Sequence, residues 1–493
     1  MRLRGSTADT EGGSRPPTAR RALGWSFANT VIAKLSGLAI GIVIARLLGP
    51  EEFGTFAVAM VALMAVLSFN ELGVSLAIVR WDGDPRRIAP TVTTISVVAS
   101  TLLFAAGLAV APVFAAAMGD PGATAVVQLM LVCVPLNGLV ATPAALLQRE
   151  FQQGRRTIAD QVNVWLGAGI SIVLAIIGVG AMSLAIGRVV ATVVFSAMII
   201  AFSPERLRFG WDRTLVRPLL SFGLPLAGAS IVVFAVAYAD QLIVGALLGS
   251  QALGFYVLAF NLASWPVTML SQPIRAVAPA AFARIQGDAN RMDAGFRAAF
   301  RVVLAVALPA CAFLSGAALP VVTFVYGAVW APAALALQWL ALQAAIRVVF
   351  ELSYDFLAVK RRSTALLVIQ FAWLAVLVPA LLVGADRGGI AGVAAAQFLV
   401  AAAVMVGGYG WALARAGVRM PALARATLVP LLGGAAALAA AYLCTQLIAS
   451  PFLAAALAGV LALAVSAGLL LLSRRSLGVL QTARAGTAEG ATA

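Results

Sequence analysis

The chain consists of about fourteen apolar stretches, and each is long enough to cross a membrane as a helix, which takes about 20 residues. The stretches begin near Trp25, Phe53, Ile88, Ala123, Thr157, Ala181, Pro218, Leu253, Ala298, Trp330, Ser363, Gly389, Thr427 and Pro451. Only 11% of the residues are charged, whereas a soluble globular chain has about a quarter. The sequence therefore predicts an all-α polytopic membrane protein.

Positive charge falls in every second gap between these stretches. Nearly all of the 34 Lys and Arg residues lie in the two tails and the even-numbered gaps. These gaps hold Arg80, Arg86 and Arg87, then Arg149, Arg155 and Arg156, then Arg206, Arg208, Arg213 and Arg217, then Arg284, Arg291 and Arg297, then Lys360, Arg361 and Arg362, and finally Arg415, Arg419 and Arg425. The odd-numbered gaps are short and neutral or acidic, as at 49–52 and 119–122, and only Arg387 breaks this pattern. The positive-inside rule then places both termini and the even gaps in the cytoplasm, as in a multi-pass protein of the cytoplasmic membrane. The net charge of +15 is thus an orientation signal and does not indicate nucleic-acid binding.

An internal repeat indicates how the spans are grouped. Residues 47–59 align without a gap to residues 247–259, and five of the thirteen positions are identical, including Gly49/Gly249 and Gly54/Gly254. A spacing of 200 residues accommodates six helices, so the two halves would be parallel repeats, as in a known transporter plan. The predicted organisation is a disordered cytoplasmic tail (1–24), a six-helix half (25–202), a cytoplasmic linker (203–217), a second six-helix half (218–414), two additional helices (427–473) and a cytoplasmic tail (476–493).

Short gaps and residue usage argue against an enzyme. No gap is longer than about 15 residues, which leaves no room for a folded soluble domain. The chain has no His, and Cys133, Cys311 and Cys444 lie far apart in sequence, so neither a disulfide framework nor a zinc spacing is present. We therefore expect a transporter whose site is built from the helices themselves, with no metal and no cofactor.

Several segments resemble a known family. They are Ile44–Gly54, Asn70–Gly73, and Tyr238–Gly245 running on into Leu253–Tyr256. These segments resemble Wzx-type oligosaccharide flippases of the multidrug/oligosaccharidyl-lipid/polysaccharide exporter superfamily, and the resemblance covers the whole chain. It implies that an undecaprenyl-pyrophosphate-linked oligosaccharide is moved from the inner to the outer leaflet by alternating access between the halves. It also implies that the polymerase and glycosyltransferases of the same pathway are partners.

Cationic residues inside the spans are the predicted substrate contacts, because a pyrophosphate that crosses the hydrocarbon needs a hydrated, cationic path. They are Lys34, Arg188, Arg275 and Arg347. Arg46 lies at the outer end of the first span, where we expect it to reach the interface. An alternative for Arg347 is that it simply pairs with Glu351 one helical turn later.

Acidic residues inside the spans are the candidates for ion coupling, since a carboxylate in a low-dielectric site can bind and release a proton or a sodium ion. They are Glu71, Asp240, Glu351 and Asp355. Arg347, Glu351 and Asp355 recur at four-residue spacing and are expected to share one helix face. Each acid is alternatively a structural partner of a buried cation.

Other functions compatible with the sequence are a small-molecule or multidrug exporter of the same superfamily and a flippase for a lipid-linked peptidoglycan precursor. A membrane-bound enzyme or polymerase of envelope glycans is a further class, against which the short gaps count. A cleft lined by cations and open to lipid would favour the lipid-linked substrates.

Overall fold

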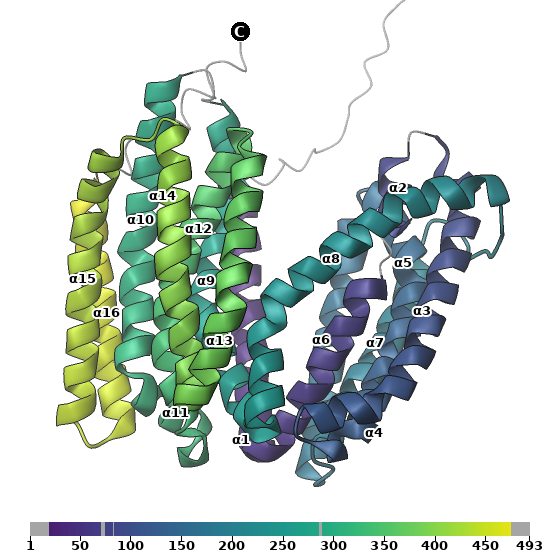
Figure 1. Ribbon diagram of the computed structural model, residues 1–493, viewed down its shortest axis with the longest axis horizontal. Helices are drawn as coiled ribbons and strands as arrows, with labels where there is room; N and C mark the ends of the chain where they lie inside the picture. Colours follow the sequence, from purple (N-terminus) through teal and green to yellow (C-terminus); the bar gives the residue numbers. More distant parts are fainter. Residues whose placement is uncertain (1–18, 71–73, 82, 285–287, 475–493) are drawn as a thin grey trace, which may run out of the picture. The chain divides into compact units, whose positions relative to one another are not determined.

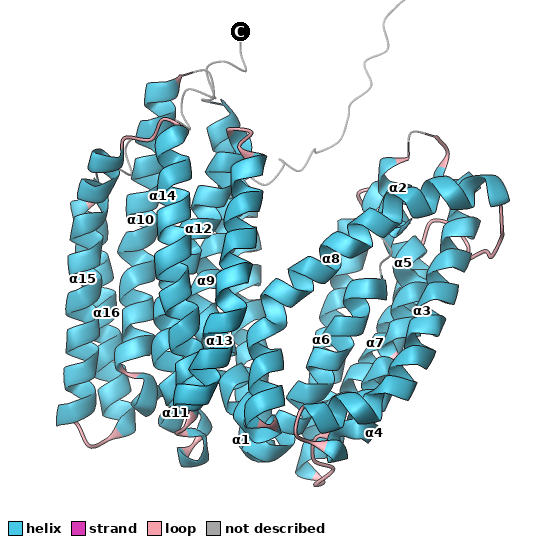
Figure 2. Ribbon diagram, viewed as in Figure 1, coloured by secondary structure: helices cyan, strands magenta, loops and turns pink. Residues whose placement is uncertain are grey.

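The computed structural model describes residues 19–70, 74–81, 83–284 and 288–474, so most of both predicted tails lies outside it. Within that part every regular element is a helix (Figure 2). Chain contacts divide the protein into residues 1–42 and residues 43–493, and the arrangement described below concerns the second unit. The helices, in the order traced in Figure 1, are α1 (Ala19–Asn70), α2 (Val74–Arg80), α3 (Pro85–Ala117), α4 (Thr124–Leu131), α5 (Cys133–Arg149), α6 (Gln153–Ile176), α7 (Met182–Phe202), α8 (Arg213–Leu248), α9 (Ser250–Arg284), α10 (Ala289–Gly316), α11 (Ala318–Tyr326), α12 (Ala333–Val359), α13 (Ser363–Val400), α14 (Val406–Arg415), α15 (Met420–Leu447) and α16 (Pro451–Leu472).

Two long helical stretches, α1 and the run from α13 through a π-helical turn at Ala401–Met405 into α14, are each divided at a glycine. Gly49 interrupts α1 with φ 74° and ψ 177°. In α13, Gly389 has φ 54° and follows the non-helical Gly388. A positive φ is tolerated best by glycine. Twelve stretches in the described residues are long and apolar enough to span a membrane. The 52-residue helix α1 is divided at Gly49, and the 52-residue stretch Thr364–Arg415 is divided at Gly388 and Gly389, which accounts for the fourteen spans predicted from the sequence.

Corresponding turns of the two halves have the same local structure, which confirms the repeat. Gly249 ends α8 with φ 86° and ψ 173°, close to the values at Gly49. Gly119 and Gly327 both have positive φ, and each precedes a short 3-10 turn. The side chains of Asp84 and Asp288 accept backbone hydrogen bonds at the start of α3 and α10, as N-caps do.

The odd-numbered turns meet at one face of the protein, where the repeated glycines pack against each other. A Cβ atom on Gly54 would lie 2.2 Å from the carbonyl oxygen of Ser250, and one on Gly254 would lie 2.7 Å from that of Pro50. Only glycine allows the two backbones to approach this closely. We call this backbone contact between residues 50–54 and 250–254 the glycine seam.

Side chains hold the neighbouring turns to the glycine seam. Glu52 accepts a hydrogen bond of 2.6 Å from the backbone N–H of Ala181, and Thr55 donates one of 2.6 Å to Asp120. The Nε1 of Trp330 donates to the carbonyl of Ala45 at 3.2 Å.

Arg46 also takes part in these contacts. Its guanidinium donates to the carbonyls of Phe324 and Val325 at the C-terminal end of α11. The sequence led us to expect that Arg46 reaches the membrane interface, but it joins two helices instead, because the last carbonyls of a helix lack intrahelical donors.

Even-numbered turns meet at their own face, where arginines join them. Arg149 donates to three carbonyls of residues 78–83, including Ile78 at 2.6 Å and Trp81 at 2.8 Å. Arg86 pairs with Glu205 at 2.7 Å. These arginines therefore connect loops in addition to setting the charge pattern.

The two additional helices pack on the second half. In Figure 1, α15 and α16 lie beside α10. A Cβ atom on Gly316 of α10 would lie 2.7 Å from the carbonyl oxygen of Leu438 of α15. No residue of α15 or α16 is among those that line the cavity described next.

Candidate functional site

A cavity of about 970 Å³ lies among helices of both halves. The first half contributes residues of α1 after Gly49 and one residue of α7, and the second half contributes residues of α8, α9, α12, α13 and α14. Its size is at the upper end of the range typical of small-molecule sites.

The wall from the first half is almost entirely apolar. Phe53, Phe56, Met60 and Met64 recur along one face of α1, as expected for spacings of three and four residues. The one charged residue of this wall is Arg188 on α7. Its side chain is exposed and forms no hydrogen bond or ion pair with any residue that the structure describes.

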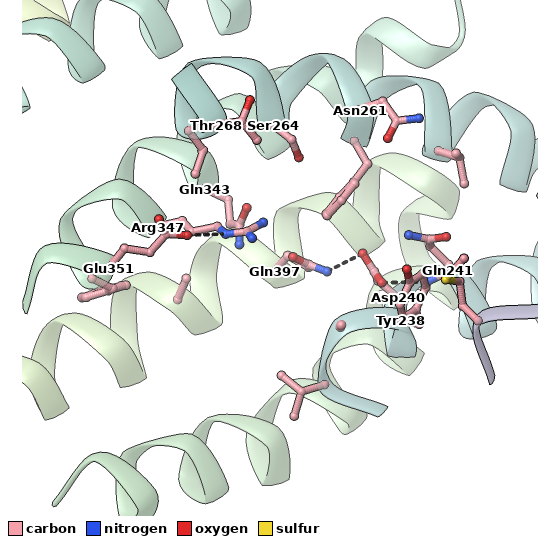
Figure 3. Close-up of a pocket in the computed structure, with 18 of the residues that line it drawn as sticks. Tyr238, Asp240, Gln241, Asn261, Ser264, Thr268, Gln343, Arg347, Glu351 and Gln397 are labelled. Carbon is pink, nitrogen blue, oxygen red and sulfur yellow. Dashed lines mark hydrogen bonds and ion pairs between the residues drawn. The ribbon is translucent and has the colours of Figure 1, made fainter. Parts of the chain in front are cut away.

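The wall from the second half is polar. On α9, Asn261, Ser264 and Thr268 share one face, and on α12, Gln343, Arg347 and Glu351 do the same. Figure 3 shows these side chains of α9 and α12 around one pocket. Gln370 and Trp373 of α13 also line this wall.

Asp240 of α8 is saturated with hydrogen bonds. One carboxylate oxygen accepts from the hydroxyl of Tyr256 at 2.8 Å and from the side-chain amide of Gln397 at 2.7 Å. The other oxygen accepts from the backbone N–H of Gln241 at 2.9 Å. Asp240 is 2% exposed, so these donors offset the cost of burying the carboxylate. The bond to Gln397 joins α8 to α13 (Figure 3).

Arg347 and Glu351 form an ion pair on α12. The guanidinium Nε lies 3.3 Å from a carboxylate oxygen, and the side chains are 47% and 20% exposed, respectively. The structure thus contains the pairing that the sequence offered as an alternative to substrate contact. Both side chains nevertheless line the cavity (Figure 3), so the pair itself can contact a ligand.

The structure brings together four of the eight predicted residues, namely Arg188, Asp240, Arg347 and Glu351. Asp355 is buried and is not among the lining residues. Its expected position on the same helix face as Arg347 and Glu351 stays a prediction, since burial places it away from the cavity without deciding the face. The side chains of Lys34 and Arg275, and the whole of Glu71, lie outside the described residues.

The sequence interpretation missed the neutral polar residues of the site. Gln343, Gln370 and Gln397 lie in predicted spans, and Asn261 lies one helical turn from Ser264. Polar side chains at helical spacing in an apolar span were the signal, since such residues rarely face lipid. No pattern in the sequence indicated that Tyr256 donates a hydrogen bond to Asp240.

A family model described as "Polysaccharide biosynthesis protein" matches residues 43–335. The succinoglycan biosynthesis transport protein ExoT of Rhizobium meliloti (strain 1021) is 26% identical over 334 residues, which cover 67% of each chain. The lipopolysaccharide biosynthesis protein WzxC of Escherichia coli (strain K12) is 24% identical, over 76% of this chain and 77% of its own.

Solved structures share the fold at low sequence identity. The lipid II flippase MurJ in an inward closed conformation superimposes with a TM-score of 0.75 at 14% identity, over 92% of this chain and 99% of its own. An inward-facing multidrug transporter of the MATE family gives a TM-score of 0.60 at 18% identity, over 79% of this chain and 94% of its own. These likenesses show a shared fold, and the family model over residues 43–335 confirms the relation to polysaccharide biosynthesis proteins that the sequence motifs indicated.

Proposed function

Because the chain belongs to the polysaccharide biosynthesis protein family, we propose that it moves an undecaprenyl-pyrophosphate-linked oligosaccharide from the inner to the outer leaflet of the cytoplasmic membrane. Two relatives are named as transport or biosynthesis proteins for succinoglycan and lipopolysaccharide. The site contains no loop domain and is formed entirely by helices. Transport therefore accounts for it better than glycan polymerisation does.

The observation that carries this proposal is the guanidinium of Arg188, which pairs with no described residue, on the wall of a large cavity between the two halves. A pyrophosphate accepts hydrogen bonds and attracts positive charge, and an arginine can bind it with two parallel hydrogen bonds. A charged side chain within a membrane span is expected to face water or an anionic ligand, since contact with lipid is costly. Lys34 and Arg275 remain proposed headgroup contacts, and Arg347 is proposed to contact the glycan or the pyrophosphate together with its partner Glu351.

Movement between leaflets would proceed by alternating access. The glycine seam and its neighbouring contacts close one face of the protein, which the charge pattern assigns to the outer side. Opening that face requires the two backbones at Gly54 and Gly254 to separate. Asp240, Glu351, Asp355 and Glu71 are the proposed ion-coupling carboxylates, and Asp240 is favoured because its bonds to α9 and α13 link helices of the second half.

Leaflet-resolved labelling tests the proposed function. Cells depleted of the protein should accumulate the lipid-linked sugar in the cytoplasmic leaflet, where a reagent confined to the outside does not label it, and should lose one surface polysaccharide. Wild type should restore labelling, while Arg188→Gln should restore it poorly at equal protein level. An unchanged leaflet distribution on depletion would refute the proposal and favour a small-molecule exporter. Accumulation of a peptidoglycan precursor instead would identify the other lipid-linked substrate.

A further inference from the structure

The two walls of the cavity differ in chemistry. Of the described residues that line it, four are charged: Arg188, Asp240, Arg347 and Glu351. Arg347 is matched by Glu351 at 3.3 Å, and Asp240 already accepts three hydrogen bonds. Arg188, on the wall of the first half, is therefore the described lining charge that has no counterpart.

The wall of the second half instead offers neutral hydrogen-bonding groups. The side-chain amides of Gln343, Gln370 and Asn261 line the cavity and form no hydrogen bond with the described residues. Each amide carries two donors and an acceptor, which matches sugar hydroxyls, since these both donate and accept. Leaving such amides without partners against an apolar group would be unfavourable.

An aromatic surface lies beside these amides. Trp373 is three residues from Gln370 on α13, and both line the cavity. Its indole Nε1 is covered and has no partner among the described residues, so the ring carbons are what Trp373 presents to the cavity. An aromatic ring next to amide groups suits a pyranose, which has an apolar C–H face and hydroxyls around its rim.

We propose that the wall formed by Gln343, Gln370 and Trp373 is a subsite for an uncharged saccharide, with the pyrophosphate end of the lipid-linked substrate at Arg188. This inference rests on the proposed function and specifies the class of glycan. Glu351 lines the same cavity and adds a carboxylate to it, and the Nε of Arg347 already contacts this carboxylate. A uronic acid would bring a second negative charge into the cavity, so we assign Glu351 a role in excluding acidic sugars.

Binding to the purified full chain in lipid nanodiscs tests the subsite with three probes. These are polyprenyl pyrophosphate without sugar, the same lipid carrying a neutral hexose disaccharide, and the same lipid with a uronic acid in the second sugar position. Native mass spectrometry gives the dissociation constants. The neutral disaccharide should tighten binding at least about tenfold over the bare lipid, which a few good hydrogen bonds supply.

Substitutions in the cavity lining test which residues provide the gain in affinity from the disaccharide. Gln343→Ala or Gln370→Ala should remove about three- to tenfold of the gain in affinity that the disaccharide gives over the bare lipid. Gln338→Ala is the matched control, because Gln338 lies on the same helix and does not line the cavity. Glu351→Gln should reduce the preference for the neutral over the acidic sugar by about tenfold or more, since it frees Arg347.

The outcomes separate the two proposals. If the bare lipid binds in an Arg188-dependent way but the uronic acid probe binds wild type as tightly as the neutral one, the neutral subsite is wrong and the proposed function stands. The same holds if the Gln343 and Gln370 variants behave like Gln338→Ala. If no polyprenyl pyrophosphate probe binds wild type, the proposed function itself fails.

Discussion

The glycine seam should act as a gate, and a single methyl group at Gly54 is the most direct way to test it. A Cβ atom there would lie 2.2 Å from the carbonyl oxygen and 2.7 Å from the carbonyl carbon of Ser250. Carbon and oxygen in contact normally lie about 3.3 Å apart. The two backbones would therefore have to move apart by about 1 Å, and neither can move like a flexible side chain.

The cost of this overlap falls only on the conformation in which the seam is closed. Extra methyl groups in packed regions cost about 1–3 kcal/mol, and a difference of that size shifts a two-state equilibrium by about 5- to 150-fold. Gly54→Ala should thus populate the conformation with the seam open. Gly254→Ala should act in the same way, because its Cβ atom would lie 2.7 Å from the carbonyl oxygen of Pro50.

Thiol labelling measures the shift. A Ser264→Cys reporter lies on the cavity wall, and the native cysteines are buried. A membrane-impermeant thiol reagent added on the side of the odd-numbered turns, which we expect to be outside, should label the reporter several times faster in Gly54→Ala than in the parent. Gly228→Ala is the control, because its Cβ atom would have no neighbour within 4 Å. Labelling rates equal to the control in both seam variants, with the proteins folded, would refute the reasoning.

Three further perturbations follow from the contacts. Arg46→Ala removes the hydrogen bonds to the end of α11, and it should increase labelling of the same reporter from the outside by about three- to tenfold; rates at the parental value would show that this contact does not hold the gate. Asp240→Asn should abolish any dependence of transport on an ion gradient in proteoliposomes, whereas unchanged gradient dependence would assign Asp240 to structure. Hydrogen bonds from Thr214 hold the pKa of Asp212, the N-cap of α8, below its ordinary value. The stabilisation by this cap is therefore fully present at pH values above the ordinary pKa of aspartate. It is lost as the pH falls through the lowered pKa of Asp212. Asp212→Ala should lower the thermal midpoint near pH 7, and the difference from wild type should vanish in acid.

Much of the fold could be predicted from the sequence because the membrane imposes simple rules. Span length is fixed by bilayer thickness, and the side of each loop follows from its arginines. The identity between residues 47–59 and 247–259 was a further signal, since glycines that allow close backbone contact cannot be replaced freely. The all-α membrane fold and its two parallel halves were predicted correctly on these grounds.

The candidate site was only partly predictable. Sequence spacing identified the Arg347–Glu351 pair, because partners four residues apart meet on one helix. It could not show that Asp355 is buried and does not line the cavity, because burial depends on which helices pack against α12. Nor could it indicate that Arg46 binds the end of α11 about 280 residues later, since that contact depends on how the two halves pack.

The sequence by itself thus determined the elements, their order, their grouping into two halves and the residue types available for a site. Each of these depends on the local composition and on the spacing of residue types, and both can be read directly along the sequence. The tertiary structure decided which charged side chains have partners: Asp240 accepts hydrogen bonds from Tyr256 and Gln397, Glu351 pairs with Arg347, and Arg188 pairs with no described residue. Electrostatic energy depends on distance in space and on burial, and helices far apart in the chain set both.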